Sequence, residues 1–154
     1  MSILALDLAT HTGFAIIDNG KVCESGEWDF TRAEGEHYGH MFRKLEEKLG
    51  KFDLYCIDTI AYELAHHRGG AATRITTGMN AVALMYAAQC NARVHSFHTA
   101  TLKKWATGNG KAKKPDMMAW VTKRIGREVI HDNEADAIVV GLYAYSLTNR
   151  VDPF

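Results

Sequence analysis

Residues 3–18, ILALDLATHTGFAIID, predict two apolar strands joined by a short polar turn, with one acid at the end of the first strand. Strands that are apolar on both faces are typical of the centre of a sheet. Asp7 is the exception, because strand interiors disfavour Asp and an unpaired buried carboxylate is costly. Two interpretations remain open: a metal ion compensates Asp7, or Asp7 caps the turn formed by residues 10–13.

The length of 154 residues indicates a single domain, residues 1–154, that can bury a core without disulfides. We expect residues 149–154 to form a flexible tail. Three cysteines without metal-type spacing, Cys23, Cys56 and Cys90, predict reduced and mostly buried thiols. We see no leader-like start and no apolar run of membrane-spanning length, so we expect a cytoplasmic protein, in the host cytoplasm if it is viral.

The net charge of zero hides an uneven distribution. Residues 1–63 contain twelve acids and six bases, a balance of −6, whereas residues 101–127 contain eight bases and one acid, a balance of +7. A basic stretch of this density favours a polyanionic partner, although a solvated charged helix face is the alternative.

The apolar periodicity predicts the remaining elements. After the first hairpin we expect strands at 21–30, 52–61 and 93–97, and helices at 33–50, 71–90, 99–106 (with Thr99 or Thr101 as N-cap), from near Pro115, and 132–147. Hairpins join the first three strands and helical crossovers join the later ones. The expected fold class is therefore α/β, a mixed five-stranded sheet whose first three strands are antiparallel and last two parallel, with helices on both faces. The helix at 71–90 is so apolar all round that we expect it to be central or covered by a partner subunit.

Four acids stand at element ends: Asp7, Glu63, Asp132 and Asp136. If the first and fourth strands lie side by side, Asp7 and Glu63 converge, and the start of the last helix brings Asp136 to the same pocket. Hard oxygen ligands suit Mg²⁺ or Mn²⁺, and two such ions about 3.5–4 Å apart promote phosphodiester hydrolysis. The alternatives are a surface role for Glu63 and helix capping by Asp132 or Asn133, with Glu134 and Asp136 merely favouring the positive end of the helix.

Histidines beside these acids have two interpretations each. His66 and His67, next to Arg68, are either solvated loop residues or contacts to bases and phosphate. His131, next to Asp132, either assists a metal or proton transfer or has no such role.

Taken in order, these segments resemble the RuvC family of Holliday-junction resolvases, within the ribonuclease-H-like superfamily. The resemblance is carried by ILALDLATHTGFAI, YELAHHRGG, TLKKWATGNGKAKK and DNEADAIVVGLYAY. The pieces TGNGKAKK and DNEADA are most similar to phage-type members. The resemblance implies a ribonuclease-H-like fold, a homodimer and Asp7, Glu63 and Asp136 as metal ligands. The remaining ligand position falls on Asn133, but Asp132, one residue earlier, supplies the charge, and we favour Asp132.

The resemblance also implies DNA contacts. Lysines near the scissile phosphate match Lys103 and Lys114, and the aromatic residue that helps to open the junction is His66 here. The family's Pro–Gly after the first aspartate is replaced by Leu8–Ala9. The residues that we expect to bind DNA are Lys103, Lys104, Lys111, Lys113, Lys114, His66, His67 and Arg68.

Together with the acid pattern, this resemblance implies a Mg²⁺-dependent endodeoxyribonuclease, with Mn²⁺ able to substitute. It would resolve four-way and other branched DNA by paired hydrolysis that leaves 5′-phosphates, with Asp7, Glu63, Asp132 and Asp136 as catalytic residues. Two alternatives stay open. One is a branched-DNA-binding protein without cleavage, suggested by Asn133; the other is a ribonuclease-H-type enzyme on RNA/DNA hybrids, which shares the fold.

Overall fold

The computed structural model describes residues 1–64 and 69–148. The predictions for His66, His67 and Arg68, and for the tail at 149–154, lie outside the described residues. Five strands form one sheet in the order β3-β2-β1-β4-β5. Their bounds are β1 Ser2–Asp7, β2 His11–Asp18, β3 Lys21–Asp29, β4 Thr59–Glu63 and β5 Arg93–Phe97.

The strand directions confirm the predicted mixed sheet. β1 pairs antiparallel with β2, which pairs antiparallel with β3, and β1 pairs parallel with β4 in a register that sets Leu6 opposite Tyr62. β4 pairs parallel with β5. Asp7 and Glu63, each one residue further along, therefore end neighbouring parallel strands at the same edge of the sheet.

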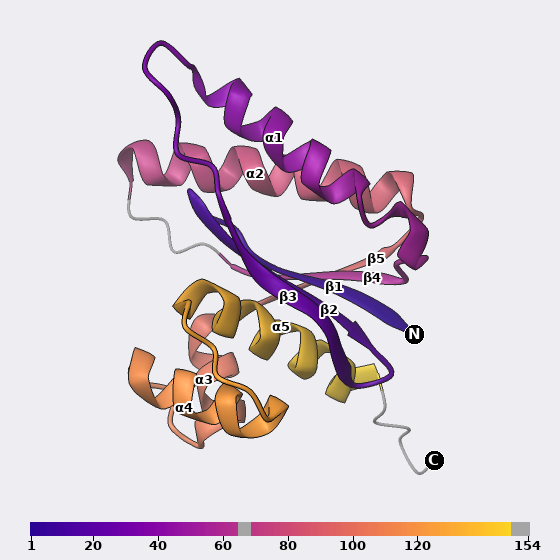
Figure 1. Cartoon of the computed structure of the whole chain (residues 1–154), viewed down its shortest axis with the longest axis vertical. Coiled ribbons are helices and arrows are strands. Elements are labelled where there is room, and N and C mark those ends of the chain that lie inside the picture. Colours follow the sequence, from indigo (N-terminus) through magenta and orange to yellow (C-terminus); the bar gives the residue numbers. More distant parts are fainter. Residues whose placement is uncertain (65–68, 149–154) are drawn as a thin grey trace.

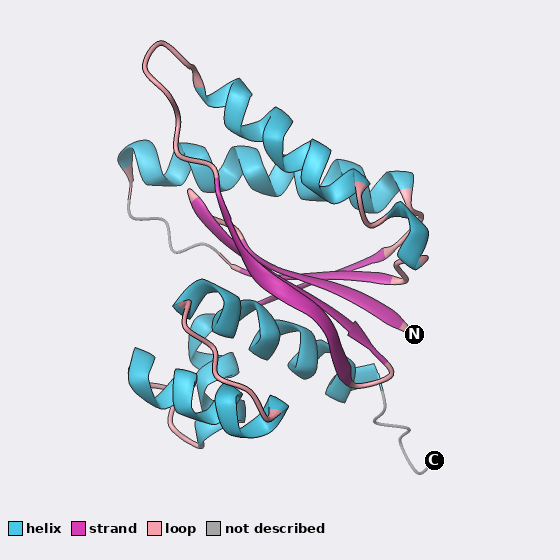
Figure 2. Cartoon of the chain, viewed as in Figure 1, coloured by secondary structure: helices cyan, strands magenta, loops and turns pink. Residues whose placement is uncertain are grey.

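Helices cover both faces of the sheet, which forms the middle layer (Figure 2). Helices α1 (Tyr38–Gly50) and α2 (Gly70–Gln89) lie on one face, and α5 (Asp132–Thr148) lies on the other, with α3 (Thr99–Thr107) and α4 (Lys114–Ile125) outside it (Figure 1). Gly141 lets α5 approach closely, because a Cβ there would lie 2.5 Å from Cγ1 of Ile17. The sheet thus has an apolar core on each side.

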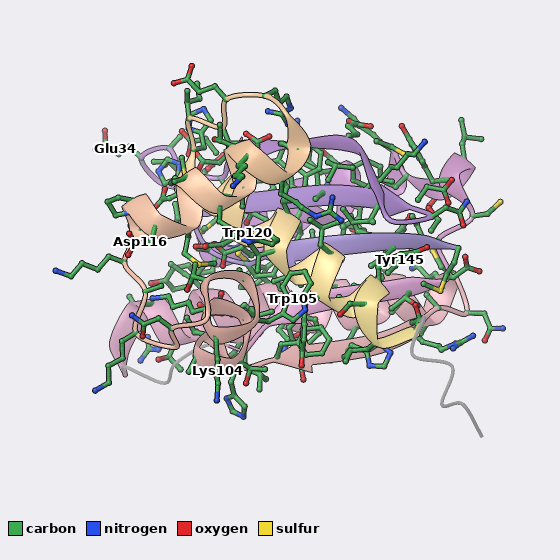
Figure 3. The ribbon with its side chains drawn as sticks, turned by 90° about the horizontal axis from the view of Figure 1, so that it is seen from below. Glu34, Lys104, Trp105, Asp116, Trp120 and Tyr145 are labelled. Carbon is green, nitrogen blue, oxygen red and sulfur yellow. The ribbon has the colours of Figure 1, made fainter. Side chains whose placement is uncertain are left out.

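The outer helices pack on α5 through aromatic rings. Trp105 of α3 and Trp120 of α4 meet edge to face at 5.4 Å, and Trp105 lies 5.5 Å from the ring of Tyr143 of α5. Figure 3 shows Trp105 and Trp120 beside α5. This packing fixes α3 and α4, and with them Lys103, Lys104 and Lys114, against α5.

Two predicted elements begin later than expected. The strand predicted at 52–61 starts at Thr59, because Asp53–Tyr55 form a 3₁₀ turn and Cys56 has a left-handed backbone (φ 49°). The helix predicted from residue 33 starts at Tyr38. The preceding loop turns at Gly35 (φ 82°), and His37 occupies the N-cap and accepts a hydrogen bond from the Gly39 N–H.

Two smaller predictions were also wrong. The cysteines are free, as expected, but Cys23 and Cys56 are exposed and Cys90 is partly buried. Cys23 lies on the edge strand β3 and Cys56 in the left-handed turn, where neither thiol faces a core. The N-cap of α3 is His98, not Thr99 or Thr101. In the described ranges we find no helix long and apolar enough to span a membrane.

Candidate metal and nucleic-acid site

A pocket of about 280 Å³ opens where the end of β4 meets α3, α4 and α5. The parallel register of β1 and β4 and the four-residue spacing within α5 bring distant acids to this place. Among the described residues its lining comprises Glu63, Thr99, Lys103, Lys114, Met117, Met118, Asp132, Ala135 and Asp136. Three of the four predicted acids therefore share one pocket.

Asp7, the fourth acid, lies beside this pocket at the end of β1. Burial raises the pKa of Asp7 well above its ordinary value, and the charges of Asp136, Glu63 and Asp132 raise it further. Asp7 thus lies within electrostatic reach of the three other acids. Between residues 9 and 12 the turn is closed by Thr12, whose hydroxyl donates to the Ala9 carbonyl at 2.6 Å, and in residues 1–64 and 69–148 no hydrogen bond joins this turn to the Asp7 carboxylate.

The two acids of α5 have opposite pKa shifts. Burial, followed by the charges of Glu63 and Asp132, raises the pKa of Asp136 to about 7. A hydrogen bond from the Lys114 ammonium holds the pKa of Asp132 below its usual range, and the same bond raises the pKa of Lys114. Lys114 therefore neutralises Asp132, while Asp136 and Asp7 have no comparable cation bound to them in the described structure.

The side chain of Asn133 turns away from the four acids and towards β3. Its Nδ2 donates to Oε2 of Glu27 on β3 at 2.7 Å, and the described lining of the pocket includes Asp132 but not Asn133. Of the two neighbouring candidates, Asp132 is the one whose side chain reaches the pocket.

The predicted lysines divide into two groups. Lys103 and Lys114 line the pocket, whereas Lys104, Lys111 and Lys113 are exposed on α3 and on the loop that leads into α4. These five side chains form a basic surface next to a group of carboxylates. Such a surface can contact several phosphates of one nucleic-acid chain.

The chemistry of the donor set fits a hard divalent cation. All four candidates are carboxylates, and the raised pKa values of Asp7 and Asp136 arise partly from repulsion that a cation would relieve. In residues 1–64 and 69–148, no three Asp, Glu, His or Cys side chains are already spaced as metal ligands. These carboxylates would have to draw together around an ion.

The sequence analysis missed the contacts of three residues near the pocket and on the first turn of α5. The Thr99 hydroxyl donates to Glu63 Oε1. Glu134, assigned only to the helix end, is 5% exposed and accepts from Ser25 and Arg127 at 2.7 and 2.6 Å, which ties α5 to β3. Glu27 holds Asn133. The sequence could have indicated Glu134, because it is an acid within an otherwise apolar helix pattern. No sequence pattern indicated the contacts of Thr99 or Glu27.

Comparison with known proteins agrees with this geometry. The structure of Thermus thermophilus RuvC superposes with a TM-score of 0.80 at 16% identity, covering 96% of each chain. The T. thermophilus RuvC structure in complex with a Holliday junction substrate gives 0.81 at 17% identity, covering 96% of this chain and 97% of that one. At these identities the likeness shows the shared fold.

Sequence comparison identifies the family. RuvC of Corynebacterium diphtheriae is 35% identical over 75 residues, which are 48% of this chain and 46% of that protein. RuvC of Corynebacterium glutamicum is 32% identical over 85 residues, 54% of this chain and 38% of that protein. The matches thus span less than half of the relatives' own lengths; the resemblance to phage-type members stays a prediction. Because the family model described as crossover junction endodeoxyribonuclease RuvC matches residues 3–143, the chain belongs to the RuvC family.

Proposed function

We propose that this protein is a divalent-metal-dependent endodeoxyribonuclease that resolves four-way and other branched DNA. The observation that carries the proposal is the convergence of Glu63, Asp132 and Asp136 on one pocket, with Asp7 beside it and lysines at its rim. Family membership supports the same activity. The products would carry 5′-phosphates. The protein would act on branched DNA in the cytoplasm.

The cation would be Mg²⁺, with Mn²⁺ able to substitute, held by Asp7, Glu63, Asp132 and Asp136. Asp132 is preferred over Asn133 because its carboxylate lines the pocket, whereas the Asn133 amide is bound to Glu27. When bound, the ion supplies activation of a water molecule and charge stabilisation at the leaving oxygen.

The other residues of the site would position DNA. Lys103 and Lys114 lie at the pocket and bind the phosphates next to the cut, and Lys104, Lys111 and Lys113 bind more distant phosphates without reading sequence. Thr99 orients the carboxylate of Glu63 through its hydrogen bond.

A second copy of the chain is the proposed protein partner. The outer side of α2 exposes Leu84 and Met85, which are 42% and 59% exposed, and large apolar side chains in neighbouring positions favour an interface. Two sites related by a two-fold axis match the two-fold symmetry of a four-way junction. Met85→Glu should then shift the sedimentation coefficient from dimer to monomer, and an unchanged coefficient would argue against this face.

Cleavage of a synthetic immobile four-way junction tests the function. Each strand is labelled in turn and incubated with Mg²⁺, with EDTA, and with the Asp7→Asn variant. We expect paired nicks on opposing strands that need both the metal and Asp7. Tight binding without nicks in Mg²⁺ or Mn²⁺ would favour a binding protein, and faster cutting of an RNA/DNA hybrid would favour a ribonuclease H activity.

A further inference from the structure

The side chain of Glu27 connects the edge strand β3 to the start of α5. Its Oε2 accepts the hydrogen bond from Asn133 Nδ2 at 2.7 Å, and its Oε1 lies 3.7 Å from the Nδ1 atoms of both His11 and His131. The side chain is only 16% exposed. A carboxylate that is mostly removed from water is stabilised by polar partners; Asn133 supplies a hydrogen bond, and the two imidazole rings lie nearby.

The partner that matters for the pocket is Asn133, because it lies between the two acids of α5. Asp132 precedes it and Asp136 follows three residues later, one helical turn along. With Asn133 bound to β3, the first turn of α5 can neither rotate nor slide without breaking a hydrogen bond. The direction of both carboxylates is therefore tied to Glu27, which lies outside the pocket lining.

The pair also depends on an amide at position 133. A carboxylate in place of Asn133 would lie at hydrogen-bond distance from the charge of Glu27 and would be repelled by it. Glu27 and Asn133 therefore form a matched pair: the carboxylate of Glu27 requires a hydrogen-bond donor, such as an amide, at position 133.

We propose that Glu27 is a positioning residue of the acid pocket: through Asn133 it fixes the first turn of α5 so that Asp132 and Asp136 stay directed at a bound cation. The identity of that cation rests on the proposed function, whereas the contact itself does not.

The test is Mn²⁺ binding by this chain without DNA, monitored through the electron paramagnetic resonance signal of the free ion. Glu27→Ala and Asn133→Ala should each weaken binding about tenfold or more, as is typical when a residue supporting metal ligands is lost. The double variant should bind no more weakly than either single variant, because both changes break one contact. Glu27→Gln should keep wild-type affinity, since its amide oxygen still accepts from Asn133.

Asp29→Ala is the matched control, because Asp29 is an exposed acid on the same strand, 3.8 Å from His11, and should bind Mn²⁺ like the wild type. Urea denaturation in EDTA checks that every variant is folded under the binding conditions. Wild-type affinity in both alanine variants, or losses that add up in the double variant, would overturn the positioning role while leaving the proposed function intact. A wild-type protein that binds no Mn²⁺ would overturn both.

Discussion

Gly13 packs against the backbone of Asn133, at the point where β2 passes under the first turn of α5. A Cβ at position 13 would lie 1.8 Å from the Asn133 carbonyl oxygen, far inside the contact distance of two non-bonded atoms. Gly13 also pairs with Asp7 across β1 and β2. The missing side chain therefore allows α5 to dock where its first two turns carry Asp132 and Asp136 close to Asp7.

Gly13→Ala should displace the start of α5 and so damage both stability and activity. We expect a loss of about 1–3 kcal/mol in the free energy of unfolding, as is usual for an overpacked site, and a large fall in the nicking rate. Urea denaturation and initial rates on a labelled junction measure the two effects. Gly50→Ala is the control, because a Cβ there meets no atom within 4 Å. Wild-type nicking by Gly13→Ala would contradict this account.

Asp7→Asn should abolish metal-dependent nicking yet stabilise the metal-free protein. Burial and the charges of Asp136, Glu63 and Asp132 raise the pKa of Asp7, so its ionised form is unfavourable in the folded chain at neutral pH. The amide removes that charge, and each kcal/mol recovered should raise the melting temperature by about 2–4 °C. Calorimetry in EDTA at pH 8 measures the melting temperature. A lower melting temperature for the variant would show that the ionised Asp7 carboxylate does not destabilise the folded protein.

The raised pKa of Asp136, about 7, predicts that the stability of the metal-free protein falls as the pH rises, whereas its affinity for a metal ion increases. The unfolded chain loses this proton near the ordinary carboxyl pKa, about 4. The resulting loss of stability is absent below that pH, grows as the pH rises to 7, and is complete above it. Metal-free wild type should thus lose stability relative to Asp136→Asn between pH 5 and 8.

Metal affinity should rise over the upper part of the same range, because the cation competes with the proton on Asp136. From pH 6 to pH 8, titration of one group with a pKa near 7 increases its ionised fraction about tenfold, and Mn²⁺ affinity should follow. Equal affinity at both pH values would show that Asp136 does not hold the ion.

The acid pocket could largely be predicted from sequence, because it follows from topology. Asp7 was expected next to Glu63 if the first and fourth strands were neighbours, and the parallel pairing of β1 with β4 meets that condition. The spacing of Asp132 and Asp136 follows from helical geometry in the same way. These features depend on the apolar periodicity of strands and helices, which can be read from a single sequence.

The contacts that orient the acids could not be predicted. Glu27 and Asn133 are 106 residues apart, and Thr99 and Glu63 are 36 apart, so their hydrogen bonds depend on side-chain placement after the layers have packed. The strand start predicted at Phe52 was wrong for a related reason. The apolar run from Phe52 to Ile57 resembles a strand, but a left-handed Cys56 directs it into a turn at the rim of the sheet.

Lys114 should limit metal binding and yet promote cleavage. Its ammonium group is hydrogen-bonded to Asp132 and therefore competes with a cation for that carboxylate. Lys114→Met should bind Mn²⁺ more tightly than wild type without DNA, while nicking slows because a phosphate contact is lost. The salt dependence of junction binding should also fall by about one unit in the log–log slope. Lys111→Met is the control, because Lys111 is exposed and lies outside the described pocket lining. This variant should lower the salt slope by a similar amount and leave Mn²⁺ affinity unchanged. Weaker Mn²⁺ binding by Lys114→Met would mean that Lys114 supports the acid pocket and does not compete for it.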